Sequence, residues 1–146
     1  MAMGTSNGKI LIYDIRDMQL ASELEAPTAA AVTQLAFSNK GIFLAAAWEG
    51  YDTCRVYSLH KGFAFSEIRL ADQAVSALSF DLYGGFLAIG SNQQMVISNY
   101  KNWKKILTTL SPFESGTLSS IRFERSGKKI YVTNSSSGEI VTLSMQ

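Results

Sequence analysis

Hydrophobic and polar positions recur along this chain of 146 residues with one fixed step. Phe37, Phe80 and Phe123 follow one another at intervals of 43 residues, and neighbouring apolar and glycine positions keep the same interval. A repeat of about 40–45 residues that contains several strands is typical of a propeller blade. Such a unit cannot bury both faces alone, so we expect neighbouring units to stack. The matching triplets are Leu35, Phe37 and Gly41; Leu78, Phe80 and Gly84; and Ile121, Phe123 and Gly127.

Within each unit, short runs rich in β-branched and aromatic residues lie between turns that contain glycine, and the chain has only two prolines. This pattern predicts β-strands throughout. One complete unit is expected to have strands at 32–37, 42–48, 53–59 and 63–70, and the next at 75–80, 86–89, 95–100 and 103–110. A partial first unit (9–15 and 18–25) and a last unit without an outer strand (118–123, 129–133 and 139–143) flank them.

These units predict a fold class and a set of boundaries. We expect an all-β fold, a partial β-propeller of about three and a half four-stranded antiparallel blades, whereas closed propellers have roughly 4–8 blades. The end of a blade should occupy residues 1–31, complete blades 32–74 and 75–117, and an incomplete last blade 118–146. The chain is therefore expected to be either a fragment of a longer protein or part of a ring that another chain completes.

The predicted second strands lack the alternation of polar and apolar residues that a half-exposed strand shows. Residues 42–48 and 86–89 are apolar at every position. A strand that is apolar on both faces is covered on both faces, as stacked blades require. Gly41, Gly84 and Gly127 close the first hairpin of each unit and are expected to adopt positive φ.

The formal net charge is only +1. Domains that bind nucleic acids are usually strongly basic, so direct nucleic-acid binding is not expected. The densest group of cations, Lys101, Lys104 and Lys105, is interpreted as a solvated strand edge that discourages unwanted strand pairing. We expect no signal peptide and no membrane-spanning segment, and the single cysteine, Cys54, fits a reducing intracellular compartment.

The sequence shows no catalytic or metal-binding pattern. His60 is the only histidine, which leaves no second imidazole for a metal site, and it is interpreted as an exposed loop residue. Cys54 has no histidine at a recognised spacing and is expected to be a buried small hydrophobic residue. We therefore expect a chain that is not an enzyme and has no catalytic residue, metal or cofactor.

The remaining candidate surface lies in the turns between second and third strands and in the links between blades. Side chains there project from one rim, and aromatic residues in such turns are typical interface anchors. For Trp48 and Phe113 packing between blades is an equally good interpretation, because exposed large apolar groups are unusual. The candidate partner-binding residues are Trp48, Glu49, Tyr51, Asp52, Asp72, Gln73, Asn92, Gln93, Phe113 and Glu114.

The repeated units resemble WD repeats. The pattern runs Val32-x-x-Leu35-Ala36-Phe37-Ser38-x-x-Gly41, and a third strand ends in Val56-Tyr57-Ser58-Leu59. The match is degenerate, since Tyr13-Asp14 stands where Trp-Asp is usual and no Gly-His dipeptide precedes a first strand. The buried hydrogen-bond network of typical blades therefore lacks its histidine here.

A closer resemblance is to the C-terminal WD-repeat region of the pre-mRNA-processing factor 19 family. The members of this family are U-box ubiquitin ligases and spliceosome scaffolds. Residues 35–45 are similar to the opening of that family's third-last blade, and residues 78–90 to the opening of the next blade. The charged link Tyr100-Lys101-Asn102-Trp103 resembles the family's unusual third-strand ending. The resemblance runs from about residue 4 to residue 143, and the order and spacing of weak motifs carry it.

The resemblance implies a nuclear protein that assembles into a splicing complex and uses its propeller to recruit partners or substrates. In that family ubiquitin transfer belongs to a U-box and tetramerisation to a coiled coil, and neither is found in this sequence. The family also closes its last blade with a strand from earlier in the chain, which fits the missing outer strand here.

We therefore expect a protein-interaction scaffold of pre-mRNA splicing that performs no chemistry itself. Its partners should be splicing-complex proteins, and the rest of its own propeller or a second copy should cover its open blade faces; no membrane is expected. One alternative is a WD-repeat scaffold of an unrelated complex. Others are a propeller hydrolase, which would need clustered carboxylates and a base, and an RNA-binding module that uses Trp103 and its neighbouring lysines.

Overall fold

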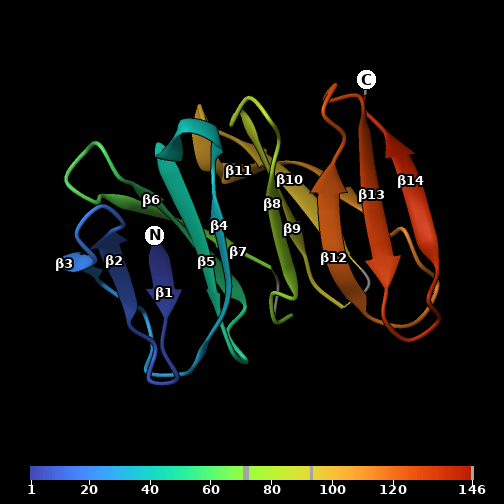
Figure 1. The fold of residues 1–146 in the computed structure, drawn as a ribbon. Helices are drawn as coiled ribbons and strands as arrows, with labels where there is room; N and C mark the ends of the chain where they lie inside the picture. Colours follow the sequence, from blue (N-terminus) through green and yellow to red (C-terminus); the bar gives the residue numbers. More distant parts are fainter. Residues whose placement is uncertain (71–72, 93, 146) are drawn as a thin grey trace.

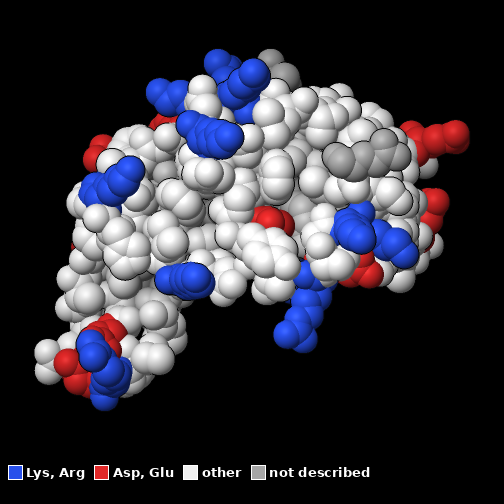
Figure 2. All heavy atoms as spheres, turned by 90° about the horizontal axis from the view of Figure 1, so that it is seen from above, with Lys and Arg blue, Asp and Glu red and all other residues white. Residues whose placement is uncertain are grey.

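Four antiparallel sheets stand side by side in the computed structural model, which describes residues 1–70, 73–92 and 94–145. Each sheet uses its strands in chain order, and we name the sheets A to D from the N-terminus (Figure 1). Seen from one end the stack curves into an arc with a concave side (Figure 2). The prediction of an all-β partial propeller is confirmed.

Sheets A and D have three strands, and sheets B and C have four. Sheet A contains β1 (Ala2–Gly4), β2 (Ile10–Asp14) and β3 (Gln19–Leu24); sheet B contains β4 (Val32–Phe37), β5 (Phe43–Trp48), β6 (Thr53–Ser58) and β7 (Phe65–Arg69). Sheet C contains β8 (Ala77–Phe80), β9 (Phe86–Gly90), β10 (Met95–Asn99) and β11 (Asn102–Leu110); sheet D contains β12 (Leu118–Phe123), β13 (Lys129–Asn134) and β14 (Ile140–Ser144). In the part of the chain that is described, no helix is long and apolar enough to cross a membrane.

The expected strands and turns agree closely with the observed ones. The three repeated glycines have φ values of 64°, 70° and 74°, as the hairpin turns require. A 3₁₀ turn, η1 (Asn39–Gly41), closes the β4–β5 hairpin, with Lys40 also at positive φ. The strand β1 was not predicted, because its three residues carry no alternating pattern; it pairs with β2 across a turn at residues 5–8.

The strand β5 is buried on both faces, and this explains its continuous apolar run. Ala45 and Ala47 belong to the core between sheets B and C. Leu44, Ala46 and Trp48, at the alternate positions, belong to the core between sheets A and B. Successive side chains in a strand point to opposite faces, so β5 contributes to two cores at once. The prediction that this strand is covered on both sides is confirmed.

The strand β9 repeats this arrangement one sheet further along. Leu87 and Ile89 pack towards sheet B, while Ala88 packs towards sheet D. Gly90 ends the strand where sheet D comes closest, because a Cβ at Gly90 would lie 2.4 Å from Cδ2 of Leu118. Small residues therefore set how closely sheets C and D approach.

We expect Ile89→Ala to lower the free energy of unfolding by about 2–5 kcal/mol, because it opens a cavity between two sheets that the stack cannot refill. Ile89 is fully buried. Ile140→Ala in β14, where the side chain is 67% exposed, should change stability by only about 0.5 kcal/mol. Urea denaturation followed by tryptophan fluorescence compares the two variants, and equal losses would contradict the stacked core.

Candidate functional site

The connections between strands gather at two opposite ends of the stack, because antiparallel strands joined in order place alternate connections at opposite ends. We call these ends the lower and upper rims, as Figure 1 shows them, with η1 at the top. The lower rim consists of the connections β1–β2, β3–β4, β5–β6, β7–β8, β9–β10, β11–β12 and β13–β14. The upper rim consists of the β2–β3, β4–β5, β6–β7, β8–β9, β10–β11 and β12–β13 turns.

Hydrogen bonds join the connections of the lower rim to one another. The Glu49 amide donates to the carbonyl of Ala31 at 2.8 Å, which holds the β5–β6 turn against the link from sheet A. Between sheets C and D, the amide of Leu118 donates to the carbonyl of Asn92 at 2.6 Å. The rim is therefore a connected surface and not a set of independent loops.

Most of the residues proposed from sequence for partner binding lie on this lower rim. Glu49, Asn92 and Glu114 are exposed, while Tyr51, Asp52 and Gln73 are half-buried; Asp72 and Gln93 lie outside the described residues.

Two of the half-buried residues are held by neighbours. The Asp52 carboxylate accepts a hydrogen bond from Nε of Arg69 at 3.0 Å, and Oγ1 of Thr53 donates to it at 3.1 Å. Gln73 accepts a hydrogen bond from the Ser91 hydroxyl at 2.7 Å.

Trp48 and Phe113 are buried beneath the rim. The Trp48 side chain is fully buried, and its Nε1 donates to the carbonyl of Gly8 at 2.9 Å, which ties sheet B to the β1–β2 turn. Phe113 packs into the core between sheets C and D and is 5% exposed. Both rings fill space between sheets, so neither side chain is available at the surface to a partner.

A hollow of about 360 Å³ opens on the lower rim between the β11–β12 link and the β13–β14 turn. Its lining includes the carboxylates of Glu114 and Glu139 and the hydroxyls of Ser115 and Ser137. Sequence reasoning missed Ser137 and Glu139, although the 43-residue step offered a signal: it places the β13–β14 turn in register with the β9–β10 turn.

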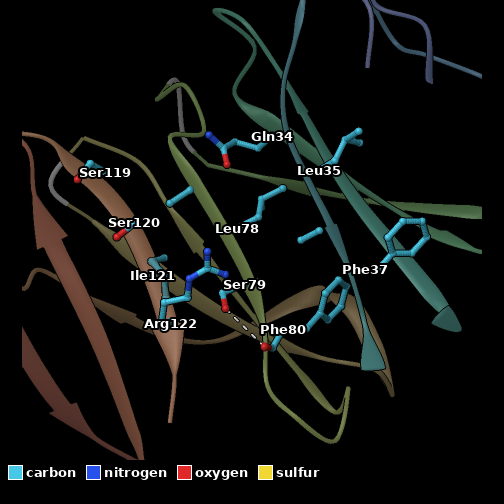
Figure 3. Close-up of a pocket in the computed structure, with 12 residues that line it drawn as sticks. Gln34, Leu35, Phe37, Leu78, Ser79, Phe80, Ser119, Ser120, Ile121 and Arg122 are labelled. Carbon is cyan, nitrogen blue, oxygen red and sulfur yellow. Dashed lines mark hydrogen bonds between the residues drawn. The ribbon is translucent and has the colours of Figure 1, made fainter. Parts of the chain in front are cut away.

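A second candidate site is the groove along the concave side, where the first strands of sheets B, C and D stand side by side (Figure 3). Its volume is about 290 Å³. Gln34 projects into it from β4, and Arg122 extends from β12 towards Ser79 of β8 (Figure 3). The lining residues are Gln34–Phe37, Ala77–Phe80 and Ser119–Arg122.

The groove can bind polar groups. Its lining offers hydroxyls, one carboxamide and the guanidinium of Arg122, and it includes no carboxylate, imidazole or thiol. General acid–base catalysis needs a titratable group within hydrogen-bond reach of the substrate. Across the described parts of the chain, no three His, Cys, Asp or Glu side chains are grouped in a way that could hold a metal ion.

The remaining reactive side chains stand apart from both sites. His60 is exposed in the β6–β7 turn of the upper rim. Cys54 is fully buried between sheets B and C, and burial raises the pKa of its thiol to about 12. The thiolate is the reactive form, so this cysteine is inert while the sheets stay packed.

We expect Cys54 to resist alkylation by iodoacetamide at pH 8 in the folded protein and to react readily in 6 M guanidinium chloride. The raised pKa also links stability to pH, because the unfolded thiol ionises near pH 9 and the buried thiol only near pH 12. Ionisation of Cys54 therefore leaves the free energy of unfolding unchanged below pH 9 and lowers it as the pH rises from 9 towards 12. Mass spectrometry of the modified protein measures the reaction. Rapid alkylation without denaturant would contradict the burial of Cys54.

No model of a known protein family matches the chain. Two curated proteins are similar to it: pre-mRNA-processing factor 19 of Dictyostelium discoideum, 26% identical over 97% of the chain, and pre-mRNA-processing factor 19 of Oryza sativa subsp. japonica, 26% identical over 90%. The chain resembles the C-terminal part of pre-mRNA-processing factor 19. It spans about a quarter of the length of these relatives, 28% and 25% respectively.

Proposed function

We propose that this chain is a propeller segment of a pre-mRNA splicing factor and that it acts as a scaffold that recruits other proteins. The observation that carries the proposal is the similarity to pre-mRNA-processing factor 19 across nearly the whole chain. The connected lower rim supports a binding role, because its turns are rigidly placed and carry exposed polar side chains. Binding residues are commonly placed on loops that a rigid core positions.

The lower rim favours a partner with basic side chains. It carries the carboxylates of Glu25, Glu49, Glu114 and Glu139 and that of Asp52, which is paired with Arg69. Glu114 and Glu139 share one hollow, which could accept a lysine or arginine side chain. Charge complementarity of this kind contributes mainly to specificity and association rate.

For the full-length protein we propose a nuclear location and membership of a splicing complex. Ubiquitin transfer, where the full-length protein performs it, would belong to a U-box outside this chain. A WD-repeat scaffold of an unrelated complex is the alternative, and the set of proteins that the chain captures distinguishes the two.

To test this, the tagged chain is incubated with nuclear extract, and the bound proteins are identified by mass spectrometry. We expect components of the pre-mRNA splicing machinery, and we expect the double variant Glu49→Lys, Glu114→Lys to recover at least fivefold less of them. Glu124→Lys makes the same change of charge on the upper rim and should recover them as the unchanged chain does. Recovery of no splicing component would refute the assignment, and undiminished recovery by the double variant would exclude the lower rim.

We further propose that another blade or a second copy of the chain covers the outer face of sheet A. Met3 and Leu11 are paired across β1 and β2, Tyr13 and Leu20 are paired across β2 and β3, and all four point away from the core that Ile12 enters. Met3 and Leu20 are 50% and 53% exposed. The outer face of sheet D is more polar: Lys129, Tyr131 and Thr133 alternate there with buried residues.

Light scattering should therefore give a mass above the 16.0 kDa of one chain, and this mass should rise with concentration. Leu20→Glu should shift the population towards the monomer, because a charge on the covered face must be desolvated. Ile140→Glu, on sheet D, serves as the matched control and should leave the mass unchanged. A monomer at every concentration would contradict the covered face.

A further inference from the structure

The two rims carry opposite charge, although the chain as a whole is almost neutral. The acidic side chains described above lie at the lower rim, while lysines and arginines project around the upper rim (Figure 2). Between sheets B and D the exposed cations of the upper rim and of the adjoining start of β11 are Lys40, Lys61, Lys101, Lys104, Lys105, Arg125 and Lys128.

These cations outnumber the acids of the same turns. Among the described residues none of the seven forms an ion pair. Two acids lie in the same turns: Asp81, which is 6% exposed and accepts a hydrogen bond from the Phe86 amide, and Glu124, which accepts one from the Ser126 hydroxyl. The seven cations outnumber these two acids. The upper rim therefore presents a positive surface that an anionic ligand could neutralise.

Two exposed tyrosines lie within this positive surface. The Tyr83 side chain is 76% exposed and the Tyr100 side chain is 55% exposed. Tyrosine and arginine are enriched among the residues that supply most of the binding energy at interfaces. Aromatic rings beside a cationic track are the arrangement on which the bases of single-stranded nucleic acids stack.

The β4–β5, β8–β9 and β12–β13 turns of successive sheets touch in a row, and both tyrosines lie against this row. A Cβ at Gly84 would lie 3.4 Å from Cβ of Ser38, so the β8–β9 turn contacts the β4–β5 turn. A Cβ at Gly127 would lie 4.0 Å from Cε2 of Tyr83, so Tyr83 reaches the β12–β13 turn. Tyr100 similarly lies 4.0 Å from a Cβ built at Gly85.

A bulge in β11 turns its lysines outwards. The register between β10 and β11 shifts around Ser98, whose hydroxyl donates to the carbonyls of Trp103 at 2.7 Å and Lys105 at 3.0 Å. Trp103 consequently points inwards and packs edge-on against Phe43 and Phe80, while Lys104 and Lys105 are exposed. The tryptophan that sequence reasoning offered for RNA stacking is buried, and the tyrosines occupy the surface instead.

Next to Tyr83 a hollow of about 400 Å³ opens between sheets C and D. Arg122 and Arg125 line it together with Leu82 and Phe80. Guanidinium groups form bidentate hydrogen bonds with phosphate, and the apolar floor suits a base or a sugar. Arg122 also lines the groove on the concave side, so the hollow and the groove adjoin.

We propose that the upper rim binds single-stranded nucleic acid, with Tyr83 and Tyr100 stacking on bases and Arg122, Arg125 and Lys128 contacting phosphates. An acidic peptide would also satisfy the cations, but it would give no reason for two exposed aromatic rings in the row. The proposal is independent of the proposed protein-binding role, which uses the opposite rim.

The test measures fluorescence anisotropy of a labelled uridine 12-mer RNA with the full chain between 25 and 200 mM salt. We expect binding that weakens with salt at a slope of about −2 to −3 in log K against log [salt], as for three or four phosphate contacts at about −0.7 each. A thymidine 12-mer DNA shows whether the 2′-hydroxyl contributes to binding. If the DNA binds as tightly as the RNA, only bases and phosphates are contacted. If the DNA binds more weakly than the RNA, the 2′-hydroxyl is contacted as well. Either result supports the site, whereas no binding to either strand at 25 mM salt would overturn it.

Variants separate stacking from charge. Tyr83→Ala should weaken binding about tenfold, within the range for loss of one stacked base, while Tyr83→Phe should bind as the unchanged chain does. Arg125→Gln should reduce the salt slope by about 0.7. Lys9→Gln removes the same charge at the lower rim and should have no effect. Because these side chains are exposed, their thermal unfolding should match that of the unchanged chain.

Two further ligands, an acidic peptide and an RNA duplex, test the alternatives to single-strand binding. If a peptide of twelve glutamates displaces the RNA at equal concentration and Tyr83→Ala binds normally, the upper rim is a site for acidic protein segments. If a 12-base-pair RNA duplex binds as tightly as the single strand, the rim recognises phosphate alone and the stacking role is excluded.

Discussion

The coverage of each inner sheet on both faces is the constraint on which this structure depends. β5 supplies alternate side chains to two separate cores, and β9 does the same one sheet further along. Hydrophobic stabilisation grows with the apolar area removed from water, so sheets B and C are stable only within a stack. Once the sheets are stacked, their strand ends are aligned into two rims, and the turns acquire fixed neighbours.

Polar contacts between sheets make this stacking specific. Arg55 is buried on β6, where its Nε donates to the Glu67 carboxylate at 2.8 Å, its Nη1 donates to the carbonyl of Glu25 at 3.1 Å, and its guanidinium lies over the Phe65 ring. The Tyr57 hydroxyl donates to the same carbonyl. A buried cation is tolerated only with such partners, so these contacts define how sheet A meets sheet B. They connect sheets in a chain whose repeats lack the histidine of typical WD repeats.

The separation of charge follows from the same architecture. In each unit the turns after the first and third strands point one way, and the turns after the second and fourth strands point the other way. Acidic residues predominate in one set of turns and lysines and arginines in the other, so a chain of net charge +1 has two rims whose local charges differ in sign. The net charge of the chain therefore underestimates how strongly either rim attracts a charged partner, because a partner responds to the local electrostatic potential.

The sequence by itself determined the strand pattern, the 43-residue unit, the positive-φ glycines and the doubly covered strands, because these depend on local backbone preference and on periodic burial. It also placed most of the candidate residues on one rim. Only the tertiary structure decided that Trp48, Phe113 and Trp103 are buried while Tyr83 and Tyr100 are exposed, and that Arg122 and Arg125 share a hollow. Whether an aromatic ring is covered depends on the distance between sheets and on the bulge in β11, and neither is encoded in the local pattern of residues.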